Sequence, residues 1–378
     1  MMTEKTASIL VTGDLVPINK AEQMLISGEY EKAFGNFLSE IQSSDLAVSN
    51  FETAATCGGE AIKKWGPNLK VAPEVLPALV KAGFDLFALA NNHSRDWGDQ
   101  AFIETMTHID NAGGKYVGGG RNLADALEPY RCVLNGIKVT VFNATMHQPC
   151  CALADRPGAN PLVPARLAAQ IAEEKGRADF ILVSIHDGKE QNPFVSRRIR
   201  ENYRGFIDAG ANAVVSHHPH IAQGYENYKD GFIAYSLGNF YFPSRKPAEA
   251  PGFWYRGFAV KLDIAPGKVL KARIIPHKLD PESQCLSLMT GQELTAFEKR
   301  IDKLNKILAN DDLCDFYFGA LSARSAYPFY QKMISSDVDY LAHATETEEH
   351  IDSISAAAKF ITEKKEYPVD LDYFSSRA

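Results

Sequence analysis

Three histidines fall within four residues of this chain, in the segment Ser216-His217-His218-Pro219-His220. The segment follows a short apolar run, residues 213–215, which is typical of a buried strand that gives way to a loop. Imidazole nitrogens bind divalent metals at neutral pH, and a surface loop has no common reason to collect three of them. The cluster therefore predicts a metal site, whereas a lone histidine would more simply be a hydrogen-bonded residue of the core or of a loop.

Polar groups also follow four other apolar runs, at the points where predicted strands end. They are Gly13-Asp14, Asn50-Phe51-Glu52, Asn91-Asn92-His93 and His186-Asp187-Gly188-Lys189-Glu190. Ligands of open α/β sheets bind at the carboxyl ends of the strands, so we expect these side chains at one rim. Taken singly, such motifs are often turns or helix caps. Together they supply carboxylate, amide and imidazole donors, which suit one or two ions of Mn, Fe or Zn at a catalytic site.

The elements that position these groups alternate along the chain, as expected for an α/β fold. Short runs rich in Val, Ile, Leu and Phe predict buried strands at 8–13, 46–49, 84–90, 138–143, 180–185, 213–215 and 232–237. Amphipathic patterns between them predict helices at 74–82, 101–112, 164–175 and 197–209. Two further runs, joined at Ala265-Pro266-Gly267, predict an antiparallel pair at 258–264 and 271–276.

The strand pattern is expected to end near residue 282, so the chain divides into an α/β domain, residues 1–281, and a helical extension, residues 282–378. The clearest helical segments of the extension are 293–309 and 346–365. Their alternating charges indicate a solvated helix face. Packing against the core is the favoured use of the extension, although it could also cover the pocket, dimerise or bind a partner.

Composition narrows the classes of function. The 378 residues carry a net charge of −7 and a pI near 5.8, which gives no support for binding nucleic acid through a broad basic surface. No apolar run reaches membrane-spanning length, and the N-terminus lacks the apolar core of a signal peptide, so we expect a cytoplasmic protein without a membrane anchor. The six cysteines are scattered and are expected to be reduced thiols.

Six motifs in this order resemble those of the CapA family, the poly-γ-glutamate capsule biosynthesis proteins of the calcineurin-like metallophosphatase superfamily. The resemblance runs from about residue 8 to residue 280. It is carried by Thr12-Gly13-Asp14, Ser49-Asn50-Phe51-Glu52, Ala90-Asn91-Asn92-His93-Ser94-Arg95-Asp96-Trp97-Gly98, His186-Asp187-Gly188-Lys189-Glu190, His217-His218-Pro219-His220 and Ser236-Leu237-Gly238-Asn239-Phe240. It implies a four-layered αββα sandwich, followed here by the helical extension, with a metal centre at the strand ends.

The resemblance also implies roles for single residues. The implied metal ligands are Asp14, Glu52, Asn92, His186, His218 and His220. Glu52 would take the place of the bridging aspartate of the superfamily, and His93, acting with Asp14 at the catalytic centre, would give a proton to the leaving group. The first motif of the superfamily is Asp-x-His, but Asp14 is followed by Leu15 and Val16, so one imidazole is missing and one metal position is expected to be weak or empty.

Several neighbouring residues are candidate contacts of an anionic small-molecule or polymer substrate. Three basic residues can pair with a carboxylate or phosphate: Lys189, Arg95 and Arg245. For each of them, an ordinary solvated position on the surface is an equally good interpretation. His217 and Asn239 complete the substrate set, and residues 241–255 indicate a long loop that could serve as a lid. Glu190 and Asp96 are expected to orient ligands, and His147 to be structural.

Two functions follow from this pattern. The first is a metal-dependent hydrolase or transferase that acts on a phosphoester or a γ-glutamyl-type amide, with the metal stabilising negative charge at the reacting centre. The second is a non-catalytic accessory or binding protein of a poly-γ-glutamate synthesis system, which the missing imidazole favours.

Overall fold

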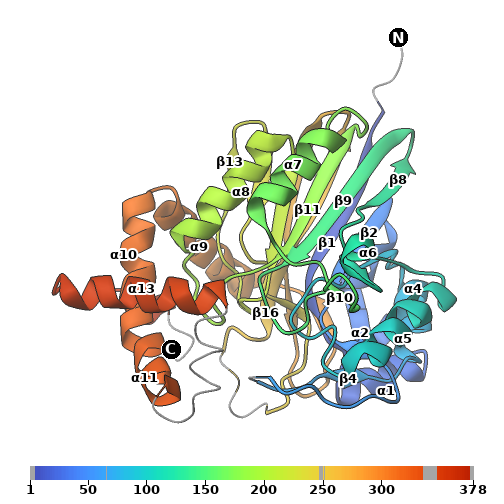
Figure 1. The fold of residues 1–378 in the computed structure, drawn as a ribbon, viewed down its shortest axis with the longest axis horizontal. Coiled ribbons are helices and arrows are strands. Elements are labelled where there is room, and N and C mark those ends of the chain that lie inside the picture. The colour runs from blue at the N-terminus through green and yellow to red at the C-terminus, as the bar shows by residue number, and fades with distance from the viewer. Residues whose placement is uncertain (1–4, 65, 247–249, 251, 335–346, 375–378) are drawn as a thin grey trace.

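The computed structural model describes residues 5–64, 66–246, 250, 252–334 and 347–374. Its larger sheet has eight strands in the order β18-β17-β16-β1-β2-β5-β6, with β15 beside β1 (Figure 1). These strands are β1 (Ala7–Leu15), β2 (Leu46–Phe51), β5 (Leu86–Ala88), β6 (Lys115–Val117), β15 (Asn239–Tyr241), β16 (Arg256–Ala265), β17 (Lys268–Leu279) and β18 (Leu286–Leu288).

The second sheet has six strands in the order β13-β14-β12-β11-β9-β8. They are β8 (Tyr130–Leu134), β9 (Ile137–Thr145), β11 (Phe180–His186), β12 (Ala213–His217), β13 (Tyr225–Tyr228) and β14 (Gly231–Ala234). Two short pairs lie outside these sheets: β3 (Ala54–Ala55) with β4 (Lys70–Val71), and β7 (Gly119–Gly120) with β10 (Gly158–Ala159).

Helices cover the outer faces of both sheets, so the main body has four layers (Figure 1). The larger sheet carries α1 (Lys20–Ile26), α2 (Tyr30–Phe34), α3 (Leu38–Gln42), α4 (Val75–Ala82) and α5 (Gly98–Asn111). The second sheet carries α7 (Pro164–Glu174) and α8 (Arg197–Ala209), and the short α6 (Leu123–Ala126) lies beside β7. Apolar side chains of the two facing sheets, such as Val11 and Val183, form one buried core between them.

The fold confirms the predicted α/β architecture. Each predicted strand and helix that lies in the described residues overlaps an observed one, and β16 and β17 form the predicted antiparallel pair. The prediction that the strand pattern ends near residue 282 is wrong, because β18 adds an edge strand that pairs with β17. Leu286, which opens β18, is buried in the core under α1–α4, and this burial explains why the sheet continues.

The C-terminal segment is helical and packs on the main body. It contains α9 (Gly291–Leu308), α10 (Asp311–Leu321), a five-residue π-helical turn (Ser322–Ala326), α11 (Tyr327–Ile334), α13 (Glu348–Thr362) and α14 (Leu371–Phe374). Apolar residues of α9, such as Ile301 and Leu304, join the core between the sheets. The expected packing role is therefore observed, while one charged residue of α13, Glu349, is buried and not solvated.

Candidate metal centre

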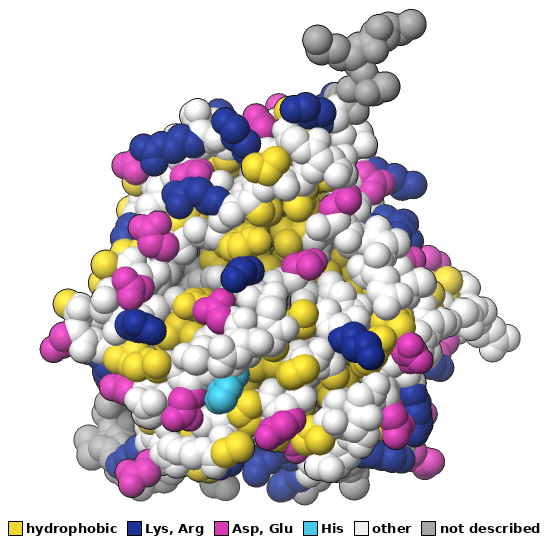
Figure 2. Space-filling view, turned by 90° about the vertical axis from the view of Figure 1, so that its right-hand side faces the viewer, with side chains coloured by type: hydrophobic (Ala, Val, Ile, Leu, Met, Phe, Trp, Pro, Cys, Tyr) yellow, Lys and Arg dark blue, Asp and Glu magenta, His cyan; other side chains and the backbone are white. Residues whose placement is uncertain are grey.

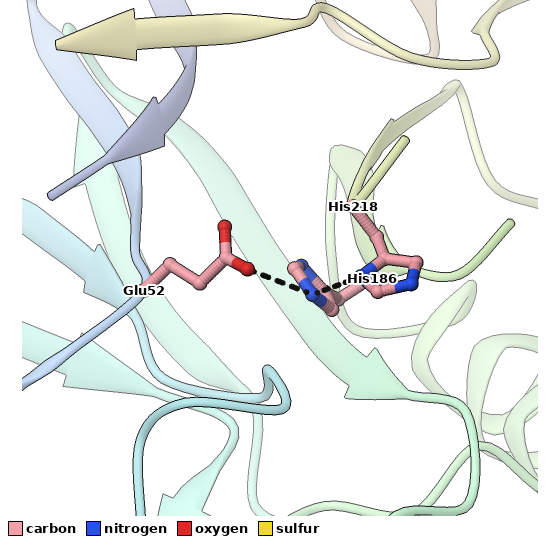
Figure 3. Close-up of side chains that lie close together, drawn as sticks. All are labelled: Glu52, His186 and His218. Carbon is pink, nitrogen blue, oxygen red and sulfur yellow. Dashed lines mark hydrogen bonds and ion pairs between the residues drawn. The ribbon is translucent and has the colours of Figure 1, made fainter. Parts of the chain in front are cut away.

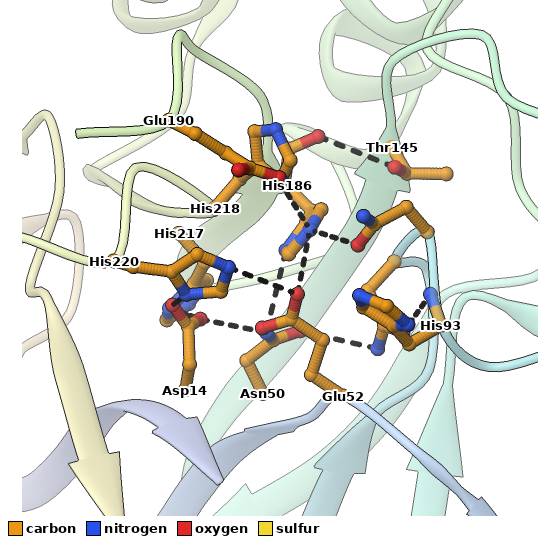
Figure 4. A network of polar contacts seen from close by, with 12 residues as sticks. Asp14, Asn50, Glu52, His93, Thr145, His186, Glu190, His217, His218 and His220 are labelled. Atoms are coloured by element: carbon orange, nitrogen blue, oxygen red, sulfur yellow. Dashed lines mark hydrogen bonds and ion pairs between the residues drawn. The ribbon is translucent and has the colours of Figure 1, made fainter. Parts of the chain in front are cut away.

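Five strand ends bring the predicted residues to one rim of the two sheets (Figure 4). Parallel pairing of β1 with β2 places Asp14 opposite Asn50, and parallel pairing of β11 with β12 places His186 opposite His217. Side chains from both sheets thus meet where the strands end. The resulting cluster is buried, with none of its acidic or imidazole groups more than 5% exposed: Asp14, Glu52, His93, His186, His217, His218 and His220.

The loop after β12 is bent sharply so that its imidazoles turn back into the cluster. His218 and His220 have φ angles of 97° and 59°, in the left-handed region that residues other than glycine rarely adopt. Such backbone conformations cost about 1–3 kcal/mol each and persist at functional sites that the surrounding structure holds in place. This His-x-His segment is therefore positioned at an energetic cost.

Glu52, His186 and His218 form one group of potential ligands, which we call the His186 group (Figure 3). The Nε2 atom of His186 lies 3.1 Å from Nδ1 of His218 and 3.5 Å from Oε1 of Glu52. The predicted ligand Asn92 is also present, with its Oδ1 atom 2.9 Å from Nε2 of His186. Two imidazoles, one carboxylate and one amide oxygen thus converge.

Asp14, Glu52 and His220 form a second group, the Asp14 group. The Oδ2 atom of Asp14 lies 3.1 Å from Nδ1 of His220, and Oε1 of Glu52 lies 3.8 Å from Nε2 of His220. The missing imidazole of the first motif has no replacement on β1, because Leu15 and Val16 are buried in the apolar core under the outer helices. A third group, Glu190, His218 and His220, includes the exposed Glu190.

Several buried polar atoms of the cluster lack hydrogen-bond partners within the described part of the chain. They are Oε1 of Glu52, both ring nitrogens of His217 and Nε2 of His218. A buried polar atom without a partner costs about 1–3 kcal/mol of stability. Several such atoms in one cluster indicate a site that binds a further group. Mixed oxygen and nitrogen donors fit a divalent cation such as Mn, Fe or Zn, and the residues present therefore fit the implied metal.

Electrostatics couple the members of the Asp14 group. Burial and the neighbouring charge of Asp14 raise the pKa of Glu52 well above its ordinary value. Burial alone would raise the pKa of Asp14, but the hydrogen bond and charge of His220 outweigh it and leave that pKa lowered. Burial would lower the pKa of His220, yet the charges of Glu52 and Asp14 raise it to about 10. Without a metal, His220 therefore carries a proton at neutral pH.

Two other imidazoles, those of His186 and His217, are neutral at pH 7. Burial, followed by the charge of His218, brings the pKa of His186 well below its ordinary value. Burial lowers the pKa of His217 to about 4, and the residue lies with Nδ1 3.7 Å from Oδ1 of Asp14. Neutral imidazoles offer a lone pair directly, so the His186 group is ready to bind a cation without releasing a proton from His186.

Within the cluster, His93 is held by two side chains. Its Nδ1 atom lies 2.6 Å from Oδ2 of Asp96 and 3.1 Å from Nζ of Lys64, and Lys64 also forms an ion pair with Asp96. Burial and the charge of Lys64 lower the pKa of His93 to about 4. The expected orienting role of Asp96 agrees with these contacts. Nε2 remains the ring nitrogen available to a substrate.

A pocket of about 290 Å³ opens beside His93 and His220. Arg245, Phe242 and Trp254 line it, so part of the predicted lid, residues 241–255, forms its wall. The rings of Phe242 and Trp254 lie 5.4 and 5.0 Å from the ring of His220. Residues 247–249 and 251 of the predicted lid lie outside the described residues. The pocket is large enough for a small anionic group.

The remaining predicted substrate contacts lie in different surroundings. Asn239 places Oδ1 3.0 Å from Nδ1 of His220, inside the cluster. Lys189 lies with Nζ 3.7 Å from Oε2 of Glu349. Arg95 is directed elsewhere, since it donates to Asp99 and to the carbonyl oxygen of Pro149. His147, expected to be structural, is half-exposed and lies with Nδ1 2.6 Å from Oε1 of Glu348.

Three contributors were not identified from the sequence. Lys64 lies in a loop without a recognisable motif, and Asn50 belongs to a quoted motif but carried no role, although its amide donates to Asp14. Glu349 comes from α13, more than 100 residues beyond the last motif, and its Oε2 atom lies 3.4 Å from Nε2 of His218. Burial would raise the pKa of Glu349, but the charge of Lys189 and the neighbouring imidazoles of His218 and His350 hold it well below its ordinary value.

One face of the molecule carries charges of both signs. Figure 2 shows Lys and Arg side chains interspersed with Asp and Glu side chains over one face of the molecule. Across the described residues, no helix combines the length and the apolar character needed to cross a membrane.

Two relatives with similar sequences are named as biosynthesis proteins of capsule or PGA. The chain is 30% identical over 244 residues to the capsule biosynthesis protein CapA of Bacillus anthracis. The alignment covers 62% of this chain and 59% of that protein. It is 32% identical over 208 residues to the PGA biosynthesis protein CapA of Bacillus subtilis (strain 168), covering 53% of this chain and 54% of that protein. This chain therefore spans little more than half the length of these relatives.

A solved structure, the 5'-nucleotidase precursor from Thermus thermophilus, aligns with 80% of this chain and 59% of that chain, with a TM-score of 0.43 and 12% identity. The family model of the bacterial capsule synthesis protein PGA_cap matches residues 8–244, the region that carries all the strand-end motifs. Because this match spans more than half of the 378 residues, the chain belongs to the PGA_cap family of bacterial capsule synthesis proteins.

Proposed function

We propose that this chain is a metal-dependent hydrolase or transferase of the CapA type, acting on an anionic phosphoester or γ-glutamyl-type amide. The observation that carries the proposal is the pair of ligand groups that share Glu52, with buried donor atoms that lack partners in the described structure. His220 of the Asp14 group also lines a pocket. Family membership favours a poly-γ-glutamate system as the setting. A cytoplasmic location is part of the proposal, and cell fractionation tests it.

The chain's own residues supply binding, orientation and proton transfer. Glu52, His186, His218 and Asn92 would hold one divalent ion, and Asp14, Glu52 and His220 a second. A divalent ion bound there supplies Lewis-acid stabilisation of negative charge on the reacting centre. Arg245 in the pocket wall would pair with the anionic part of the substrate, and Asn239 would fix His220. The aromatic wall of Phe242 and Trp254 would limit the access of water.

His93 would give a proton to the leaving group as a general acid, which requires its protonated form. Because Lys64 contributes to the low pKa of His93, replacing it with an uncharged residue raises that pKa. In Lys64→Met, activity that depends on protonated His93 should persist to higher pH, and the alkaline limb of the kcat profile should move upward. If the alkaline limb of the kcat profile does not move, His93 is not the proton donor.

Metal analysis of protein purified without chelator tests the proposal directly. Bound Mn, Fe or Zn should fall in His218→Ala and in Asp14→Ala, while Arg95→Ala, whose side chain is directed away from the centre, should retain the metal. If neither ligand variant lowers the metal content, the metal centre is disproved. A screen of aryl phosphates against γ-glutamyl amides then assigns the substrate class.

A non-catalytic accessory role is the second candidate, and the apolar Val16 at the position of the missing imidazole favours it. In that role the pocket would bind poly-γ-glutamate without cleaving it. Retained binding of the polymer together with no turnover of phosphoesters or amides by the metal-loaded protein would support the accessory role over the enzyme.

A further inference from the structure

Helix α13 carries a carboxylate from the C-terminal segment into the metal centre. Glu349 is 5% exposed, and its Oε2 atom lies 3.4 Å from Nε2 of His218 and 3.4 Å from the backbone nitrogen of Glu190. Its Oε1 atom lies 2.8 Å from Nε2 of His350. The carboxylate is thus held from several sides, and it faces a ring nitrogen that makes no hydrogen bond within the described residues.

The two nitrogens of His218 have different surroundings. Nδ1 lies 3.1 Å from Nε2 of His186, within the His186 group, whereas Nε2 lies toward Glu349. Histidines that bind metals through one ring nitrogen commonly donate the proton of the other to a carboxylate. That contact fixes the tautomer and the ring orientation, and it makes the ligand more basic. The geometry around His218 matches this arrangement, with Glu349 as the carboxylate.

A salt-bridge cluster fixes the position of α13 relative to the strand end that carries His186. Arg198 of α8 donates to both carboxylate oxygens of Asp187, at 2.7 and 2.9 Å, and through Nε to Asp352 of α13, at 2.9 Å. Ser196 donates to the same oxygen of Asp352 at 2.7 Å. Because Asp352 lies one turn after Glu349, these contacts set the distance between Glu349 and His218.

We propose that Glu349 is a positioning residue that orients His218 for metal binding and so makes the C-terminal segment part of the metal centre. The inference rests on the proposed metal-dependent function. The inference goes beyond the proposed function because the match to the family model ends at residue 244 and does not include α13. Glu349 would not bind the ion itself. It would accept the Nε2 proton of His218 and leave Nδ1 as the ligand atom.

The test compares Glu349→Gln with Glu348→Gln, which removes the same charge from the adjacent residue of the same helix. Glu348 contacts His147 and not the centre. Glu349→Gln should weaken the affinity for Mn²⁺ or Zn²⁺, measured by titration of metal-free protein, about 10- to 100-fold. Glu348→Gln should change it less than about twofold. In metal-free protein, ¹⁵N NMR should show the Nε2-protonated tautomer of His218 in the parent chain and a mixture in Glu349→Gln.

Replacing Glu349 leaves the charge of Lys189 without its partner carboxylate, which could prevent folding. A second variant therefore serves as the control for folding. If Glu349→Gln does not fold, the double variant Glu349→Gln/Lys189→Gln removes both charges together and should show the same loss of affinity. If Glu349→Gln binds metal as Glu348→Gln does while His218→Ala loses it, the inference fails and the proposed function stands. If His218→Ala and Asp14→Ala also retain the metal, the proposed function itself fails.

Discussion

The two ligand groups share Glu52 but differ in what surrounds them. The His186 group contains two imidazoles, has Asn92 within reach and rests against a buried carboxylate of α13. The Asp14 group has two carboxylates and one protonated imidazole, and the apolar Val16, two residues after Asp14, offers it no further ligand. The first group can accept a cation without losing a proton from His186, whereas the second must lose a proton from His220 and lacks a ligand. The raised pKa of Glu52 is common to both groups. We therefore expect a tighter ion in the His186 group.

Replacing the shared ligand should have the largest effect. Glu52→Gln keeps the side chain's size but removes the carboxylate common to both groups, so both ions should be lost, with affinity falling at least about 100-fold. Metal content per chain after dialysis measures this, and thermal melting checks that the fold is intact. Retention of one ion in full occupancy would show that the two groups do not share Glu52.

Removing one imidazole from each group separates them. His186→Ala should weaken the tighter ion by about 100-fold, while His220→Ala should lose the weaker ion and leave the tighter one bound. Titration calorimetry with Mn²⁺ resolves the two steps. The opposite result, in which His220→Ala abolishes the tighter step, would reverse the assigned order of affinities.

The groups should also differ in pH dependence. The pKa of His220 is raised to about 10, so binding in the Asp14 group displaces a proton, and the affinity of that step should fall about tenfold when the pH is lowered from 7 to 6. The pKa of His186 lies well below its ordinary value, so that residue adds no such dependence to the other step. Calorimetry in buffers of different ionisation enthalpy counts the released protons. Binding in the Asp14 group without release of a proton would contradict the raised pKa of His220, whereas the proton of Glu52 is common to both groups.

The smallest effect is expected at the pocket that opens beside the Asp14 group. Arg245 is exposed in the pocket wall, so Arg245→Ala should raise the KM for an anionic substrate only about two- to fivefold and leave the metal affinity unchanged. Arg95→Ala is the matched control, because Arg95 pairs with Asp99, and its KM should stay the same. A large fall in kcat with Arg245→Ala would place that residue closer to the reacting atoms.

Much of the fold was predictable because the buried strands are short, continuous apolar runs and the helices between them are amphipathic. The end of the sheet was not, since the three residues of β18 carry too weak a pattern to be separated from a loop. The burial of Glu349 on α13 was missed for a related reason. Its alternating charges are typical of a solvated helix, and only packing shows that Glu349 is turned inward.

The sequence by itself determined the ligand types and their placement at strand ends, because a polar residue that directly follows a buried parallel strand has only one rim to occupy. Only the tertiary structure decided which ligands share a group, since Asp14 and His220 are about two hundred residues apart along the chain and meet across two sheets. It also decided the protonation of the imidazoles and the contribution of Lys64 and Glu349. Those properties depend on burial and on neighbouring charges, which no local pattern of residues encodes.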